Sequence, residues 1–382
     1  MKITDIRTAI IEANFPWNMI RVYTDTALVG LGEAYWGPGI MDVVEKLRPR
    51  LIGQDPMEVD RLWTVMMRAM SGPGSVAGAT VAAISGIEIA LLDLVGKKLK
   101  TPVYQLLGGK FRDRVRIYAD SHSPKLNDDM DGWRVRAMEV RDRGFDAIKF
   151  DLDSVVYDLL RERANRTLPN RAIRRMVEIV RVLTETLGPE VDLALDCHWS
   201  YNVTDAIRLA QALEPFELLW LEDPIPPENA DAMAQVQAAT RIPICTGENL
   251  YLRHGFRPLI EKQACHIIQP DIPRCGGLLE SKRIADMADV YYIPFAAHNI
   301  SSPVGTVASA HVCAAIRTFT VLEYHSQDIP WWNAVVGRED DPLIKDGYLA
   351  LSEASGLGIE LNDDVCRQHV RRGTLYFGET VA

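Results

Sequence analysis

Eight short apolar runs, separated by amphipathic stretches, fill the chain between about residues 115 and 323. Runs of this kind are typical of parallel strands buried on both faces. The stretches between them, such as residues 171–188, place apolar side chains at helical spacing. Eight strands with helices between them predict an α/β fold, a TIM-type (β/α)7β barrel spanning residues 116–325. The predicted strands read VRIYAD, FDAIKFD, VDLALD, LLWLE, PICTGE, HIIQPD, YYIPFAAH and FTVLE.

Residues 1–115 follow another pattern. Residues 2–13 and 19–36 alternate apolar and polar positions, which indicates antiparallel strands, and helical patterning follows them. This order predicts an α+β capping domain that ends near Gly108 and Gly109. Gly86 interrupts a strong helical pattern, which predicts a close approach by another backbone. Residues 326–382 are irregular, and we expect them to pack back on the capping domain.

The composition is that of a large soluble enzyme. Apolar residues make up 47% of the chain, and the net charge of -10 is spread along it, which argues against binding to nucleic acid or an anionic membrane. No signal peptide or membrane span is visible, so we expect a cytoplasmic protein. The six cysteines form no CxxC pair. We therefore expect reduced thiols that pack in the core and no zinc cluster.

One predicted loop is unusually long. The segment 152–170 lies between a strand and the next helix, where two to six residues are typical. Such loops lie on the catalytic face of a barrel, so the segment could be a lid or a substrate wall. It could equally be a surface or subunit-contact excursion.

Three acidic residues stand at equal intervals and each closes a predicted strand. Asp196, Glu222 and Glu248 are 26 residues apart. On neighbouring barrel strands this spacing directs three carboxylates at one point. Three oxygen ligands favour a hard divalent cation.

Other ionisable residues continue the series. Asp271, His298 and Glu323 close the next three predicted strands, Lys149 lies near the end of FDAIKFD, and His198 follows Asp196 by two residues. Each alone has a structural explanation, such as a helix cap, a core histidine or an ion pair between Lys149 and Asp151. Six consecutive ionisable strand ends favour one acid and base site instead.

The motifs that carry these residues resemble the enolase superfamily, and within it the mandelate racemase subgroup and its sugar-acid dehydratases. The resemblance covers almost the whole chain and rests on SGIEIALLDLVGKKLKTPVYQLLGG, AIKFD, LALDCHWSYN, WLEDP, TGENL, QPDIPRCGG, AAHNI and VLEYH. It implies a magnesium site at Asp196, Glu222 and Glu248. It also implies a first step in which a base removes the proton α to a carboxylate, whose new negative charge the metal stabilises.

The resemblance assigns further roles. His298 matches the general base, oriented by a hydrogen bond to Asp271. Glu323 matches the residue that contacts the substrate carboxylate or its developing charge. Lys149 matches the first lysine of the K-x-K motif found in enzymes that act on both faces of the substrate. Asp151 replaces the second lysine, so two-base racemisation loses its usual partner, although Asp151 could bind a hydroxyl, anchor Lys149 or act as a weaker base.

His198 favours elimination. The D-x-H arrangement of Asp196 and His198 resembles galactonate dehydratase-like members, in which the histidine protonates the departing 3-hydroxyl. Alternation along a strand places both residues on one face if the strand continues to residue 198. The resemblance therefore implies a dehydratase that converts a sugar acid, an aldonate or aldarate of 2R configuration such as gluconate, galactonate or rhamnonate, into a 2-keto-3-deoxy acid.

Substrate specificity is expected from the loops around residues 15–18 and 35–36 and from the segment 152–170. Candidate substrate contacts are Asp151, His122, Tyr157, His325 and Trp331, and the last four are as easily structural. A racemase, epimerase or cycloisomerase could use the same enolate, and a non-catalytic metabolite-binding protein could retain the barrel. We expect a homo-oligomer with a small-molecule substrate.

Overall fold

The structure, a computed structural model, describes residues 1–380 except 73–74, 123, 125–129, 161 and 163. The N-terminal part is an antiparallel sheet in the order β1, β2, β3, covered by helices. The predicted antiparallel strands are confirmed, but regular alternation of buried and exposed side chains is not, because residues 30–34 of β3 are all buried. The elements are β1 (Ile3–Glu12), β2 (Pro16–Thr24), β3 (Val29–Ala34), α1 (Ile40–Leu51), α2 (Val59–Ser71), α3 (Gly78–Leu99) and α4 (Val103–Leu106).

Helix α3 is the buried centre of this capping domain. Its length and apolar composition are those of a membrane-spanning helix, but 89% of its most apolar 18-residue window is buried inside the protein, so it is a core helix. A Cβ on Gly86 would lie 2.7 Å from the backbone nitrogen of Ala34 in β3. The predicted close approach at Gly86 is confirmed, and it allows α3 to pack directly on the sheet.

Eight parallel strands close into a barrel because β11 pairs with β4, and seven helical connections separate them. The predicted (β/α)7β fold is confirmed. The strands are β4 (Arg114–Ser121), β5 (Ala147–Asp151), β6 (Asp192–Asp196), β7 (Trp220–Glu222), β8 (Ile244–Thr246), β9 (Ile267–Ile268), β10 (Phe295–Ala297) and β11 (Phe319–Tyr324). The connections contain α5 (Met130–Arg141), η1 (Ser154–Leu159), α6 (Asn170–Leu187), α7 (Val203–Leu213), η2 (Glu214–Phe216), α8 (Ala230–Ala238), α9 (Leu252–Glu261), α10 (Ile272–Cys275), α11 (Leu278–Asp289) and α12 (Pro303–Ala314).

Apolar side chains fill the barrel interior below the strand ends. They include Tyr118 and Trp220, whose rings meet edge to face with centroids 5.3 Å apart. Cys245 belongs to the same cluster, and all six cysteines are buried and unpaired, as the sequence led us to expect. The interior is therefore a packed support for the strand ends and not a pore.

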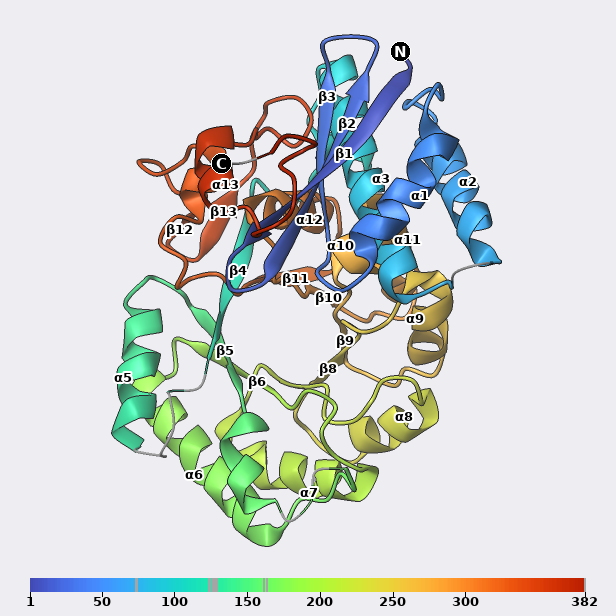
Figure 1. Ribbon diagram of the computed structural model, residues 1–382. Coiled ribbons are helices and arrows are strands. Elements are labelled where there is room, and N and C mark those ends of the chain that lie inside the picture. The colour runs from blue at the N-terminus through green and yellow to red at the C-terminus, as the bar shows by residue number, and fades with distance from the viewer. Residues whose placement is uncertain (73–74, 123, 125–129, 161, 163, 381–382) are drawn as a thin grey trace.

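The C-terminal segment joins the barrel to the capping domain. It contains η3 (Asn333–Val336), β12 (Ile344–Lys345), β13 (Tyr348–Ala350) and α13 (Asp363–Gln368). Strand β13 pairs antiparallel with β4, while Val370 bridges to Ile11 in β1. In Figure 1 these elements, coloured orange and red, lie beside β1–β3 at one side of the barrel.

Three buried carboxylates of the capping domain accept hydrogen bonds from backbone N–H groups of later segments. Glu33 accepts from Ser302 and Gly305 at the start of α12, at 3.0 and 2.7 Å. Glu88 accepts from the first two residues of α11, Leu278 at 2.8 Å and Leu279 at 3.0 Å. Asp93 accepts from Leu357 in the C-terminal segment at 2.8 Å. Each carboxylate satisfies donors that would otherwise be buried without a partner.

Replacing Glu88 with glutamine is expected to lower the free energy of unfolding by about 1–3 kcal/mol, because an amide nitrogen cannot accept one of the two backbone hydrogen bonds. Urea denaturation followed by circular dichroism measures the change. Glu261, half exposed on α9, gives a matched control whose replacement by glutamine should stay within about 0.5 kcal/mol. Equal effects for the two variants would contradict the proposed contribution of Glu88.

Candidate active site

Asp196, Glu222 and Glu248 lie together at the ends of three adjacent strands. Asp196 and Glu222 are register partners on β6 and β7, and Glu248 follows β8 by two residues. One oxygen from each lies within 4.8 Å of the other two, and all three residues are buried. Burial and mutual repulsion of like charges disfavour three bare carboxylates, so the arrangement fits a bound cation.

Lys149 on β5 lies directly beside this acidic group. Its Nζ is 2.7 Å from Oε1 of Glu222, 3.3 Å from Oδ2 of Asp196 and 3.0 Å from Oε1 of Glu323, and the residue is 1% exposed. Burial alone would lower the pKa of Lys149, but the carboxylates of Glu222 and Glu323 outweigh it and hold that pKa well above its ordinary value. The ammonium therefore stays charged and offsets part of the negative charge.

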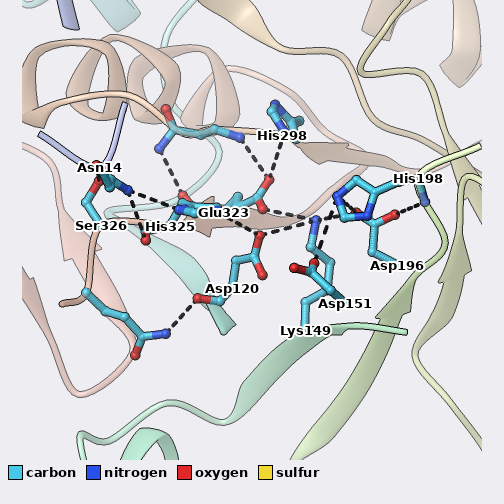
Figure 2. A network of polar contacts seen from close by, with 12 residues as sticks. Asn14, Asp120, Lys149, Asp151, Asp196, His198, His298, Glu323, His325 and Ser326 are labelled. Carbon is cyan, nitrogen blue, oxygen red and sulfur yellow. Dashed lines mark hydrogen bonds and ion pairs between the residues drawn. The ribbon is translucent and has the colours of Figure 1, made fainter. Parts of the chain in front are cut away.

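His298 and Asp271 form the predicted pair. Nδ1 of His298 is 2.7 Å from Oδ2 of Asp271, and Nε2 points toward Glu248 at 3.0 Å. Burial opposes charge on the ring, but Glu248 and Glu323 outweigh it and, with Asp271, raise the pKa of His298 to about 10. Nδ1 donates to Asp271, so Nε2 is the nitrogen that faces the acidic group (Figure 2).

Glu323 lies in β11 between the lysine and this histidine. Its Oε2 accepts a hydrogen bond from the backbone N–H of Asn299 at 3.0 Å and is 3.8 Å from Nε2 of His298. Burial would raise the pKa of Glu323, but Lys149 and His298 outweigh it and lower that pKa. With these neighbours Glu323 is ionised, so it accepts hydrogen bonds in this state.

His198 reaches the same region from the loop after β6, because the strand ends at Asp196 and the expected strand alternation does not extend to it. Nε2 is 3.6 Å from Oδ2 of Asp196 and 3.9 Å from Oδ1 of Asp151, while Nδ1 is 3.0 Å from Oδ1 of Asp153. Burial opposes charge on this ring, but Asp196 and Asp153 raise the pKa of His198 to about 11. Figure 2 shows His198, His298, Lys149 and Glu323 converging on one place.

Asp151 ends β5 opposite Asp196. Burial raises its pKa to about 7, with a further increase from Asp196 that His198 partly offsets. A carboxyl with this pKa exchanges a proton near neutral pH. Its position fits the predicted contact with a substrate hydroxyl, and that role stays a prediction.

The four remaining predicted substrate contacts lie at different places around the site. The rings of His122 and His325 meet edge to face at 4.7 Å, and Nε2 of His325 is 3.6 Å from Asp120, at the mouth of the barrel. The Tyr157 hydroxyl donates to Asp153 at 2.6 Å and lines a cavity with His198. The Trp331 ring stacks on His369 at 3.7 Å and meets the Trp17 ring edge to face at 5.2 Å, and its predicted substrate contact stays a prediction.

Two buried carboxylates of the site are absent from the sequence predictions. Asp120 lies in β4, with Oδ2 3.8 Å from Nζ of Lys149, and burial keeps its pKa well above the ordinary value. Asp120 ends the run VRIYAD, so the strand-end pattern contains a signal for it. Asp153 lies in the segment 152–170, and no sequence pattern marks it as the partner of His198.

Comparison with known proteins agrees with this arrangement. Residues 7–108 match the mandelate racemase / muconate lactonizing enzyme N-terminal domain, and residues 133–365 match the enolase C-terminal domain-like family. The chain belongs to the mandelate racemase and muconate lactonizing enzyme family of the enolase superfamily. It is therefore an enzyme of this superfamily, as the sequence motifs indicate.

Several members of the family are similar along nearly their whole length. A D-xylonate dehydratase from Haloferax volcanii is 48% identical, over 99% of this chain and 91% of its own. A D-galactonate dehydratase from Verminephrobacter eiseniae is 32% identical, over 97% and 95%, and a D-galactarolactone cycloisomerase from Agrobacterium fabrum is 31% identical, over 95% and 97%.

Among solved structures, a mandelate racemase/muconate lactonizing enzyme-like protein from Rubrobacter xylanophilus superposes with a TM-score of 0.94. It is 44% identical and covers 98% of this chain and 99% of its own. The likeness extends over both the capping domain and the barrel.

Proposed function

We propose that this enzyme is a Mg²⁺-dependent dehydratase that converts a sugar acid, an aldonate or aldarate, into a 2-keto-3-deoxy acid and water. The observation that carries the proposal is the pair of histidines, His298 and His198, whose Nε2 atoms both face the carboxylate group around Lys149. Elimination of water needs a base at C2 and an acid at C3. Two imidazoles with separate carboxylate partners supply both.

Glu248 is the carboxylate that most raises the pKa of His298, so a cation held at Glu248 would offset that charge and leave Nε2 free of its proton. In the first step, Nε2 of His298 takes the proton from C2 of the substrate. Asp271 holds Nδ1 and stabilises the imidazolium that forms. The electrons of the C2–H bond move toward the substrate carboxylate, where Lys149 supplies a fixed positive charge. Because the ammonium of Lys149 is already in place, the site needs little rearrangement as negative charge develops on the substrate carboxylate.

In the second step, the C3–O bond breaks as Nε2 of His198 gives its proton to the leaving hydroxyl, and water departs. The product is an enol, which takes a proton at C3 and loses one from the C2 hydroxyl to become the keto acid. Lys149 has no lysine partner two residues later, because Asp151 stands there. Elimination by two histidines needs no second lysine.

Asp196, Glu222 and Glu248 would hold the cation. The three ligands of this group are all carboxylates, and oxygen ligands suit Mg²⁺, whereas zinc more often binds sulfur or nitrogen. When bound, the cation supplies positive charge to the carboxylate oxygens of the substrate. The dehydratase names of relatives that match nearly the whole chain support elimination, and the 48% identity to a D-xylonate dehydratase makes xylonate the first substrate to test.

A panel of aldonic and aldaric acids, assayed for keto acids with Mg²⁺ present, is expected to give turnover on at least one member and none after removal of the metal with EDTA, with recovery on adding Mg²⁺. Saturating Mg²⁺ should also stabilise the substrate-free fold, by about 2.7 kcal/mol at 100 times the dissociation constant, seen as a rise in melting temperature. A panel without any keto acid would count against the proposal. Stoichiometric zinc in the purified protein would count against the assigned metal.

A cycloisomerase, racemase or epimerase is the second candidate, because one relative is a cycloisomerase and the same base could start each reaction. Reaction in D₂O separates the candidates. Deuterium at C2 of both epimers without loss of water supports a racemase or epimerase, whereas a keto acid with release of water supports the dehydratase.

A further inference from the structure

His198 has a carboxylate partner of its own. Nδ1 of His198 is 3.0 Å from Oδ1 of Asp153, close to the 2.7 Å that joins His298 to Asp271. Since a carboxylate only accepts, Nδ1 of His198 carries the proton in this contact. The ring is thereby turned so that Nε2 points toward Asp196 and Asp151. The two sides of the site share one design, an imidazole held at Nδ1 and presented at Nε2.

Asp153 is itself held in place. It is 2% exposed, and its second oxygen, Oδ2, accepts from the hydroxyl of Tyr157 at 2.6 Å and from that of Ser200 at 3.3 Å. A buried carboxylate with defined hydrogen bonds to each oxygen has little freedom to rotate. Its remaining acceptor position is thus directed at His198.

The backbone under His198 is strained and held from both sides. His198 and Trp199 have φ values of 43° and 57°, in the left-handed region that residues with side chains seldom adopt. The Trp199 N–H donates to the carbonyl of Asp223 at 2.7 Å, and its indole N–H donates to the Asp223 carboxylate at 2.6 Å. Arg166, from the segment 152–170, bonds to the carbonyl of Trp199. The segment therefore fixes this turn as well as supplying Asp153.

We propose that Asp153 is a positioning residue for the elimination step, which orients His198 and holds a proton on Nδ1, so that the imidazolium donates its other proton from Nε2. The proposal rests on the proposed dehydratase function. In this proposal the start of the segment 152–170 holds the ring of His198, the general acid, in position.

The proton balance explains why this contact favours elimination. His198 gives the Nε2 proton to the leaving hydroxyl, the C3–O bond breaks, and the ring becomes neutral with its remaining proton on Nδ1. That neutral tautomer is the one whose hydrogen bond to Asp153 persists. Without Asp153 the ring can rotate or carry its proton on the wrong nitrogen, and proton donation slows. Proton removal from C2 by His298 does not need this contact.

The test compares Asp153→Asn and Asp153→Ala with wild-type enzyme on the substrate with the fastest keto acid formation, in D₂O. Mutating a residue that hydrogen-bonds to a site residue typically lowers activity 10- to 100-fold. We therefore expect kcat for water loss to fall by about that factor. Exchange of the C2 proton should continue, so recovered substrate carries more deuterium at C2 than in the wild-type reaction. A purely structural role would lower exchange and elimination together.

Leaving-group chemistry gives an independent measurement. Fluoride departs with little need for a proton, so a 3-deoxy-3-fluoro substrate should be turned over by both Asp153 variants within about threefold of wild type. This activity also shows that the variants are folded. Asp158→Asn, the same substitution at an exposed position of η1, is the matched control and should behave as wild type with both substrates.

Two results would overturn the role of Asp153 alone: wild-type enzyme that forms keto acid while Asp153→Asn keeps full elimination, or variants that lose C2 exchange, elimination and fluoride release in parallel. A wild-type enzyme that exchanges or epimerises at C2 without forming any keto acid would instead overturn the dehydratase proposal, and the role of Asp153 with it.

Discussion

Replacing His298 with asparagine is expected to reduce kcat for keto acid formation by about 10⁴-fold, the upper range for loss of a general base. The side chain is 5% exposed and its Nδ1 is engaged by Asp271, which leaves Nε2 as its one reactive nitrogen. Asparagine fits the space and cannot accept a proton near neutral pH. Both keto acid formation and deuterium exchange at C2 should disappear, since both begin with the same proton transfer.

His254 provides the matched control, because it is an exposed histidine on α9 and its replacement by asparagine changes only the surface. Rates of both variants are measured with saturating Mg²⁺, and a melting temperature close to that of wild type shows that each variant is folded. Residual exchange at C2 above about one tenth of the wild-type rate in the His298 variant would show that another residue removes the proton.

Replacing Lys149 with methionine is expected to lower the free energy of unfolding by about 3–5 kcal/mol in the presence of EDTA, which is typical when one partner of a buried ion pair is removed. The ammonium is 1% exposed and lies between Asp196, Glu222 and Glu323. Methionine fills much of the same space, so the loss reflects charge more than packing. Activity should also be lost, because the charge beside the substrate carboxylate is gone.

The sign of the pH dependence follows from Asp196. Burial raises its pKa, but Lys149 and His198 outweigh it, so the folded pKa lies below the unfolded value of 3.8. Such a group adds stability above the unfolded pKa, and that stability is lost as pH falls. The loss in free energy of unfolding of the Lys149 variant, relative to wild type, should therefore be largest at neutral pH and shrink below about pH 4.

Urea denaturation of the Lys149 variant and of wild type at several pH values, with EDTA or Mg²⁺, measures this difference in stability. Mg²⁺ should recover part of the lost stability, because it supplies charge to the same carboxylates. Lys282→Met, which removes a helix-surface ion pair with Asp286, should change stability by less than about 1 kcal/mol. A Lys149 variant as stable as wild type in EDTA would contradict this account of the charge balance.

Much of this site was predictable because parallel strands end at one edge of the barrel. The 26-residue spacing of Asp196, Glu222 and Glu248 is enough to bring their carboxylates together, and the strand-end rule extends to His298 and Glu323. The same rule applies to Asp120, which the sequence interpretation overlooked at the end of the first strand.

Contacts that depend on loop path were not predictable. Asp153 meets His198 only because the chain turns back after β5, and the segment 152–170 has no periodicity that fixes this turn. For Trp331, an aromatic residue in an irregular segment gives no indication of direction, and its ring stacks on His369. Where the backbone is irregular, residue type alone does not determine which partner a side chain contacts.

The carboxylates that tie α3 and β3 to later parts of the chain limit how the protein can be re-engineered. Glu33 and Glu88 are each matched to the first turn of one particular barrel helix. A capping domain transplanted from another family member would have to bring acceptors to the same backbone groups or leave buried donors unpaired. Residues 16–18, expected in a loop, belong to strand β2. Substrate range is thus better altered at Phe15 before β2 and at Tyr35 and Trp36 after β3, near His325 and His298, which leaves these attachments intact.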